Sequence, residues 1–189
     1  YHMRIKTKKY IMKRKIYDKI LEWKRTRAGS TALMIDGARR VGKSWIAEEF
    51  AKNEYPAYLL IDFATVSAKV KRYFNEYLEN LDSFFLYLLS AYDVELPRGS
   101  LIIFDEVQRF PRAREAIKYL VADGRYHYIE TGSLISIRKN VKDIVIPSEE
   151  HHIEMFPLDF DEFLMATGHA NVLPVMEKHF RERIPLGRD

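Results

Sequence analysis

The chain has 189 residues and carries 31 Lys and Arg against 27 Asp and Glu, a formal net charge of +4. Hydrophobic residues make up 47% and aromatic residues 13%, which excludes an intrinsically disordered composition. The absence of cysteine excludes disulfides and thiolate metal sites, and no apolar run reaches the roughly 18 residues of a membrane span. Because nothing at the start reads as a signal peptide, we expect a cytoplasmic protein without a membrane association.

Residues 1–27 hold the basic character of the chain. They carry eleven Lys and Arg and two acidic residues, whereas the rest of the chain is net acidic. Their apolar residues are spaced for one face of a helix over about 10–26, which leaves the lysines to solvate the other face. A nucleic-acid-binding arm is the alternative interpretation. The apolar positions are Met12, Ile16, Ile20 and Trp23.

Beyond this helix, strand-like and helix-like segments alternate. The patterns predict, in chain order, a strand at 31–36, a helix at 44–53, a strand at 57–63, helices at 67–80 and 82–92, a strand at 101–106, a helix from Pro111 to near Gly124, and a strand at 126–133. Such alternation is typical of crossover connections, so we expect an α/β three-layer sandwich with a parallel sheet of about five strands.

The C-terminal part has a weaker pattern. We expect a loop over 140–152 and a fifth strand at "HIEMF", residues 152–156. Asp159 and Glu162 stand at capping-box spacing at the start of a helix that ends near Gly168. A last helix is expected at about 172–183.

The glycine loop after the first strand fits G-x-x-x-x-G-K-[ST], a pattern that wraps backbone amides around nucleotide phosphates. It follows a predicted strand and opens a predicted helix, as this chemistry requires. Lys43 is expected to reach the β- and γ-phosphates, and the hydroxyl of Ser44 to hold Mg²⁺. We expect one of the two loop arginines to add positive potential. The predicted nucleotide-binding residues are Gly37, Ala38, Arg39, Arg40, Val41, Gly42, Lys43, Ser44 and Trp45.

An acidic pair follows the third predicted strand, "LIIFDE". Asp105 is delivered to the carboxyl end of the sheet, where it can share Mg²⁺ with Ser44. Glu106 is then placed to take a proton from an attacking water. The pair favours a hydrolytic ATPase over a small-molecule kinase or a Ras-like GTPase.

Four stretches together resemble the bacterial and archaeal AAA-type ATPase cores that precede a C-terminal domain of unknown function. The resemblance covers about residues 10–170 and implies a P-loop fold of the additional-strand type, with the 126–133 strand between the first strand and the "LIIFDE" strand. It also implies ATP as the nucleotide. The stretches are "GARRVGKS", "LIIFDEVQRFPRAREAIKYL", "YIETGSLISIRKN" and "FPLDFDEFL".

The resemblance sets the expected domain limits. We expect residues 1–3 to be an expression remnant, 4–170 to be the P-loop ATPase domain with its basic helix, and 171–189 to begin a truncated C-terminal region. Related proteins often carry Asn as a phosphate sensor at the tip of the fourth strand, where this chain has Thr131 and Ser133. Either hydroxyl can orient the attacking water or cap the next segment, and Thr131 is assigned to the catalytic set. Arg112, Arg114 and Arg138 are candidate arginine fingers, and the alternative for each is a solvated charge at the surface.

Three functions therefore remain open from the sequence. The first is an Mg²⁺-dependent ATPase, and the second is an ATP-dependent switch with slow turnover that controls the docking of a partner or of a second copy in a homo-oligomer. The third makes the basic helix a nucleic-acid adaptor. A steep salt dependence of nucleic-acid binding, lost with residues 1–27, separates the third from a solvated helix.

Overall fold

The computed structural model describes residues 14–133 and 150–185, which form two compact units. The larger unit spans Ile16–Phe156. The smaller unit combines the described residues before Ile16 with those from Pro157 onward.

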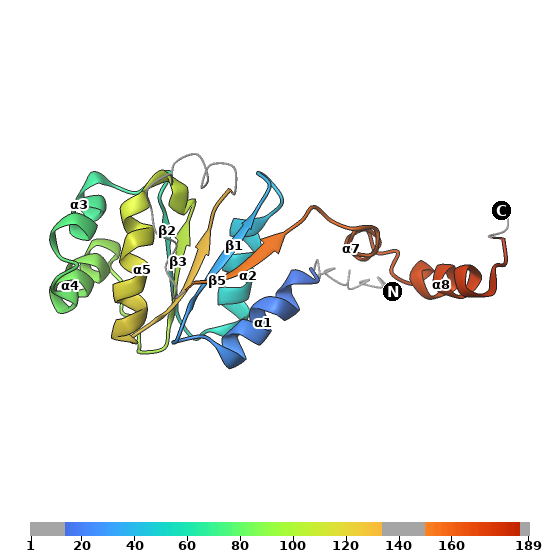
Figure 1. The fold of residues 1–189 in the computed structure, drawn as a ribbon, viewed down its shortest axis with the longest axis horizontal. Coiled ribbons are helices and arrows are strands. Elements are labelled where there is room, and N and C mark those ends of the chain that lie inside the picture. Colours follow the sequence, from blue (N-terminus) through green and yellow to red (C-terminus); the bar gives the residue numbers. More distant parts are fainter. Residues whose placement is uncertain (1–13, 134–149, 186–189) are drawn as a thin grey trace, which may run out of the picture. The chain divides into compact units, whose positions relative to one another are not determined.

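Strands and helices alternate in the larger unit in the order that the sequence predicts (Figure 1). Its strands are β1 (Ala32–Gly37), β2 (Tyr58–Asp62), β3 (Leu101–Asp105), β4 (His127–Thr131) and β5 (Glu150–Met155). Its helices are α1 (Ile16–Thr26), α2 (Lys43–Glu54), α3 (Ala68–Glu76), α4 (Leu81–Tyr92), the 3-10 helix η1 (Val107–Arg109) and α5 (Pro111–Asp123).

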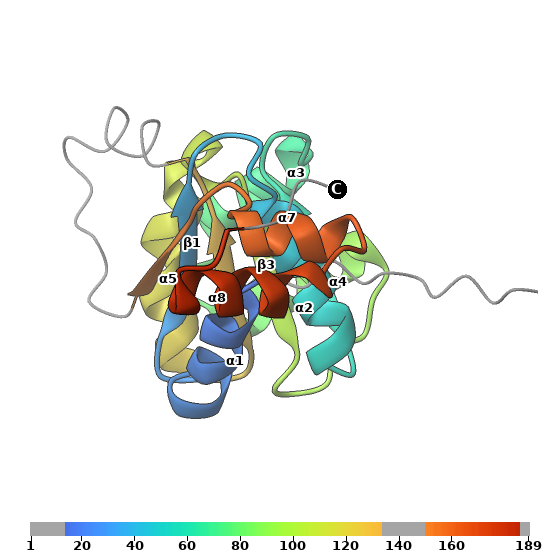
Figure 2. The same ribbon diagram turned by 90° about the vertical axis from the view of Figure 1, so that its right-hand side faces the viewer.

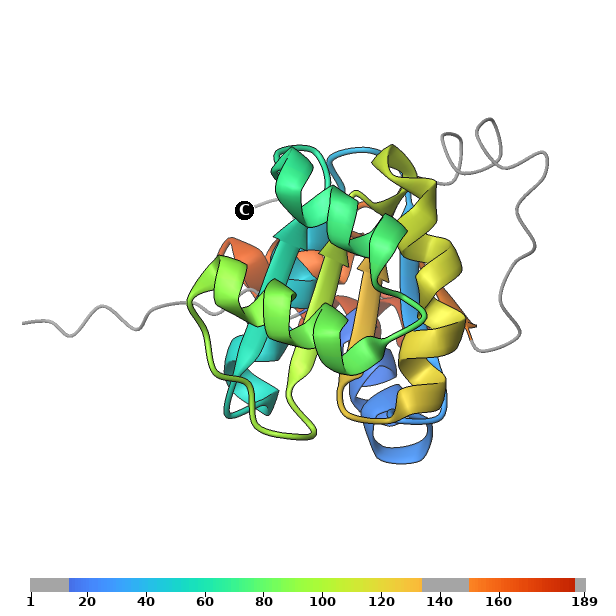
Figure 3. The same cartoon turned by 90° about the vertical axis from the view of Figure 1, so that its left-hand side faces the viewer.

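The five strands form one parallel sheet in the order β2-β3-β4-β1-β5. Every residue of β1 and β3 is buried, because helices cover both faces of the sheet. Helices α3, α4 and α5 cover one face (Figure 3), and α1 and α2 cover the other (Figure 2). The predicted three-layer α/β fold is confirmed, and so is the position of β4 between β1 and β3.

The basic helix is an integral part of the larger unit. Ile16, Ile20 and Trp23 are all buried and belong to the core that α1 and α2 form against the sheet. The predicted apolar face is thus confirmed at these three positions, while Met12 lies outside the described residues. The packing of this face is what the interpretation as a structural helix requires.

The sequence prediction is wrong at the start of β5. The strand begins at Glu150, whereas the sequence predicts loop up to residue 152; residues 134–149 lie outside the described part. The error arises because the first three residues of the strand, Glu150, His151 and His152, are all polar. They are tolerated there because Arg114, on α5, pairs with the carboxylate of Glu150.

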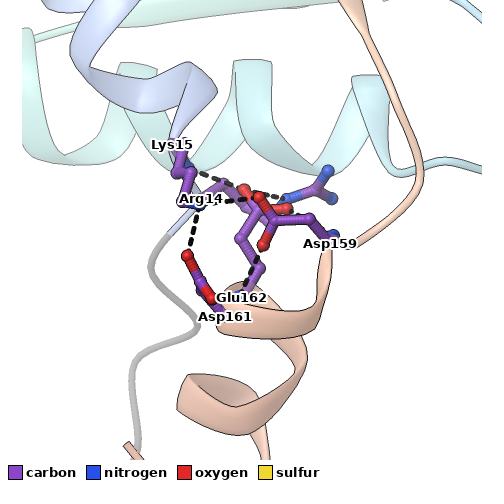
Figure 4. A network of polar contacts seen from close by, with 5 residues as sticks. All are labelled: Arg14, Lys15, Asp159, Asp161 and Glu162. Carbon is purple, nitrogen blue, oxygen red and sulfur yellow. Dashed lines mark hydrogen bonds and ion pairs between the residues drawn. The ribbon is translucent and has the colours of Figure 1, made fainter. Parts of the chain in front are cut away.

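The smaller unit contains α7 (Phe160–Ala166) and α8 (Val172–Glu182). The predicted capping box is confirmed, because the Asp159 carboxylate accepts from the Glu162 N–H and the Glu162 carboxylate accepts from the Asp159 N–H. Glu162 also accepts hydrogen bonds from the Arg14 side chain (3.2 Å) and the Lys15 N–H (2.7 Å) (Figure 4). Across both units, none of the described helices is long and apolar enough to cross a membrane.

Candidate nucleotide-binding site

The glycine loop joins the end of β1 to the start of α2. Gly37 (φ 140°), Arg40 (φ 68°) and Gly42 (φ 99°) all have positive φ angles, which glycine adopts at little cost and arginine rarely adopts. Successive turns of this kind let backbone N–H groups converge on one anion. The helix that starts at Lys43 contributes the positive end of its dipole at the same place.

Gly37 also meets a second constraint, because β1 and β5 approach closely at their ends. A Cβ atom at Gly37 would lie 2.2 Å from the carbonyl oxygen of Met155. We therefore expect Gly37→Ala to lower the free energy of unfolding by about 1–3 kcal/mol, through backbone strain and displacement of β5.

Denaturant unfolding of Gly37→Ala measures this effect. Gly124→Ala is the matched control, because Gly124 has a positive φ of 70° but a Cβ atom there would meet no atom within 4 Å. A loss of stability no greater than that of the control would contradict the close contact between the two strands.

The Lys43 side chain folds back over the loop. Its Nζ donates to the carbonyl oxygens of Gly37 (3.2 Å) and Ala38 (2.8 Å), and the residue is only 6% exposed. Burial lowers the pKa of the ammonium group, and the nearby carboxylates of Glu106, Asp105 and Asp36 oppose that shift. The cation is therefore held among the groups that are expected to surround a bound phosphate.

The other predicted loop residues differ in exposure. Ala38, Arg39 and Arg40 are exposed, whereas Val41, Gly42 and Ser44 are partly buried. Trp45, in the first turn of α2, is 41% exposed. The exposed arginines leave positive side chains at the open side of the loop.

Asp105 and Glu106 lie at the carboxyl end of β3, beside the end of β4. The Thr131 hydroxyl donates to Asp105 Oδ1 and accepts from the N–H of Glu106 (3.2 Å). Thr131 is fully buried, so its hydroxyl links the two strand ends within the sheet. Ser133, the other candidate for orienting a water, lines the adjacent cleft.

Glu106 turns the chain sharply after β3 with a φ of 55°. Its carboxylate oxygen Oε2 accepts a hydrogen bond from the Gln108 amide (2.7 Å) and pairs loosely with Arg109 (3.9 Å). Glu106 opens onto a cleft of about 440 Å³. The other residues that line this cleft are Arg39, Phe63, Ala64, Lys71, Gln108, Arg109 and Ser133.

Sequence reasoning missed Gln108, Arg109 and Lys71. Gln108 and Arg109 follow Glu106 by two and three residues, and that proximity is the only signal that the sequence offers for them. Lys71 lies on α3, far from the acidic pair in sequence, and only the fold brings it to the cleft.

The described candidate arginine fingers lie in different environments. Arg114 is neither a solvated surface charge nor an available finger, since it is 2% exposed and bonds both oxygens of Glu150 (3.0 and 2.8 Å). Arg112 bonds the Phe74 carbonyl (3.4 Å) and Glu115 (3.0 Å). Arg138 lies outside the described residues.

A buried polar cluster lies between α5 and the sheet, next to the loop. Besides Arg114, Glu150 accepts a hydrogen bond from His152 (2.7 Å), which lies 3.7 Å from Asp36. Glu130 is fully buried, and no donor among the described residues reaches either of its carboxyl oxygens. Burial, reinforced by the charge of Glu150, raises the pKa of Glu130 well above its ordinary value. A protonated Glu130 is then a donor toward Glu150.

This cluster gives a pH-dependent expectation for Glu130→Gln. In the unfolded chain Glu130 loses its proton above a pKa of about 4.3, whereas in the folded chain it keeps the proton up to its raised pKa. In the window between these two pKa values, the stability of the parent therefore falls as pH rises. Glutamine has no proton to lose. The variant should therefore gain on the parent by up to about 1.4 kcal/mol for each pH unit within the window.

Urea unfolding of both proteins at pH 5 and pH 8 checks this expectation. Glu115→Gln, which removes a carboxylate that is 44% exposed on the same helix as Arg114, serves as the control. Parallel pH profiles for Glu130→Gln and the parent would show that Glu130 is ionised in the folded protein.

The donor atoms at the site suit Mg²⁺. Asp105 offers a carboxylate whose Oδ1 is already oriented by Thr131, and Ser44 offers a hydroxyl. Within residues 14–133 and 150–185 there is no group of three or more His, Cys, Asp or Glu that could hold a metal ion by itself. Mg²⁺ does not need one, because it commonly binds one or two protein oxygens together with substrate phosphates and water.

The sheet order, with β4 between β1 and β3, and the glycine loop between β1 and α2 define the class: a P-loop NTPase fold. The chain belongs to the AAA domain family, whose model matches residues 29–164. Together, the family and the fold support a nucleotide-binding ATPase.

A solved structure agrees with this fold. A closed-state cryo-EM reconstruction of Hsp104 with ATPγS and FITC casein matches with a TM-score of 0.52 and 17% sequence identity. The match covers 86% of this chain and 29% of the Hsp104 chain. At this identity the similarity concerns the fold alone. The comparison with curated proteins finds no match.

Proposed function

We propose that the chain binds ATP and hydrolyses it with Mg²⁺ at the carboxyl end of its sheet. One observation carries the proposal: the Lys43 ammonium group is buried within the loop after β1 and donates to the carbonyls of Gly37 and Ala38. Asp105 and Glu106, at the carboxyl end of β3, oppose the lowering of its pKa by burial. A cation within a phosphate loop, opposed by a carboxylate pair, is the arrangement that phosphoryl transfer to water needs.

The proposed roles of the site residues follow from their chemistry. The backbone from Gly37 to Ser44 cradles the phosphates, with Lys43 exchanging its two carbonyl partners for phosphate oxygens. Ser44 and Asp105 would hold Mg²⁺, which would neutralise phosphate charge. Trp45 and the loop arginines border the nucleotide.

Glu106 is the proposed general base. Its carboxylate is partly exposed to the cleft and accepts the proton of a water that attacks the terminal phosphate. Thr131 keeps Asp105 and the Glu106 backbone in register, through the two hydrogen bonds of its hydroxyl.

Phosphate release from ATP tests the proposal, with Mg²⁺ and with EDTA in parallel. Phosphate release that requires Mg²⁺ supports the proposal, and no phosphate release above background with Mg²⁺ contradicts it. GTP in a parallel assay tests the choice of ATP, which rests on the family.

An ATP-dependent switch with slow turnover is the second candidate. It is favoured by the state of Arg114, which is buried and bonds both oxygens of Glu150, and so does not offer a cation to the transition state. A homo-oligomer in which a second copy supplies that cation fits the same observation. ATP retained through purification supports the switch, whereas bound ADP supports steady hydrolysis.

A further inference from the structure

The short helix η1 places a side-chain amide against the proposed base. Glu106 has a left-handed backbone conformation, and this turns the chain so that residues 107–109 form a single 3-10 turn directly behind it. Val107 is fully buried and anchors that turn. Gln108 thereby reaches back two residues, and its Nε2 donates to Glu106 Oε2 at 2.7 Å.

The hydrogen bond engages one of the two carboxylate oxygens. Arg109 approaches the same Oε2, at 3.9 Å, while no described residue bonds Oε1. The Glu106 side chain is 32% exposed, on the wall of the cleft that Arg39 and Ser133 also line. Oε2 is thus engaged by Gln108, and Oε1 is available to accept a proton.

We infer that Gln108 is the positioning residue for Glu106, holding Oε2 so that Oε1 faces the attacking water. The inference rests on the proposed hydrolysis. A hydrogen bond to a charged carboxylate is about twice as strong as one between neutral groups, so it can hold a flexible glutamate in one rotamer. The Gln108 amide oxygen is enclosed and has no hydrogen-bond partner among the described residues, so the amide is committed to Glu106 alone.

The expected consequence concerns turnover and not binding. Gln108→Met keeps the length of the side chain and removes its N–H donors. We expect kcat to fall about tenfold, the size expected from losing one charge-assisted hydrogen bond, while KM and the affinity for ATP stay within about twofold of the parent. Asn53→Ala is the matched control, because it removes another amide–carboxylate pair, the exposed one with Glu49 on α2 (3.3 Å). It should leave kcat unchanged.

A double-mutant cycle with Glu106→Gln separates positioning from a general structural effect. If Gln108 acts through Glu106, Gln108→Met should add no further loss in the Glu106→Gln background, measured by single-turnover hydrolysis. A further loss of about tenfold in that background overturns the inference, and so does an unchanged kcat for Gln108→Met alone. Parent-like turnover by Glu106→Gln overturns the choice of Glu106 as base, and with it this inference. Weakened ATP binding by Gln108→Met would place its effect in the phosphate site and also overturn it.

Discussion

Lys43→Ala is expected to lower the affinity for both ATP and ADP by about 10- to 100-fold, the size of a lost charge-assisted contact. The side chain is the buried cation of the loop, and its present partners are two backbone carbonyls that a phosphate can replace. Both nucleotides should be affected, because the lysine is expected to reach the β-phosphate that they share. Calorimetric titration of the parent and the variant measures the effect.

Lys52→Ala is the control for Lys43→Ala. Lys52 lies on the same helix, but it is half-exposed and pairs with Glu48 at 2.8 Å. Its removal should leave nucleotide affinity unchanged. Because Lys43 also satisfies loop carbonyls, thermal unfolding of both variants must show a folded protein before affinities are compared. Equal affinities for a folded Lys43→Ala and the parent would refute the phosphate loop as the binding site.

Glu106→Gln is expected to abolish most hydrolysis while nucleotide binding is kept. A positioned general base contributes about 10²–10⁴-fold, so the loss in kcat should fall in this range. The amide retains the size of the side chain but cannot accept the proton of the attacking water. Steady-state phosphate release at saturating ATP gives kcat, and titration with ATP gives the affinity.

Glu76→Gln controls for the loss of one negative charge elsewhere on the larger unit. Its carboxylate is half exposed and pairs with Arg72 on α3 at 3.7 Å. We expect parent-like turnover from it. If Glu106→Gln also hydrolyses ATP at the parent rate, the base lies at another residue.

The sheet could be predicted from the sequence because its strands are short apolar runs with clear ends. The buried runs of β1 and β3 and the glycine loop identify their positions directly, and Pro111 and Gly124 delimit α5. The order of the strands in the sheet could not be predicted in this way. Periodicity carries no information on which strands are neighbours, so the place of β4 between β1 and β3 follows only from the resemblance to a family.

The finer features of the site depend on local geometry and on long-range packing. The hydrogen bond between Gln108 and Glu106 forms because the Glu106 backbone adopts a positive φ. No pattern of residue types predicts that conformation for glutamate. Arg114 and Glu150 are 36 residues apart and meet only because α5 packs over the edge of the sheet next to β5. Sequence reasoning therefore places Arg114 at the surface, where most arginines lie.

The location of the nucleotide is the central claim, and amide chemical shifts of the isotope-labelled chain test it most directly. On addition of ATP and Mg²⁺ we expect the largest changes at Gly37–Ser44, with smaller ones at Asp105, Glu106 and Thr131. The amides of α7 and α8 serve as the internal reference. Changes concentrated in α7 and α8, or no changes at saturating ATP, would contradict the claim that the loop after β1 is the ATP site.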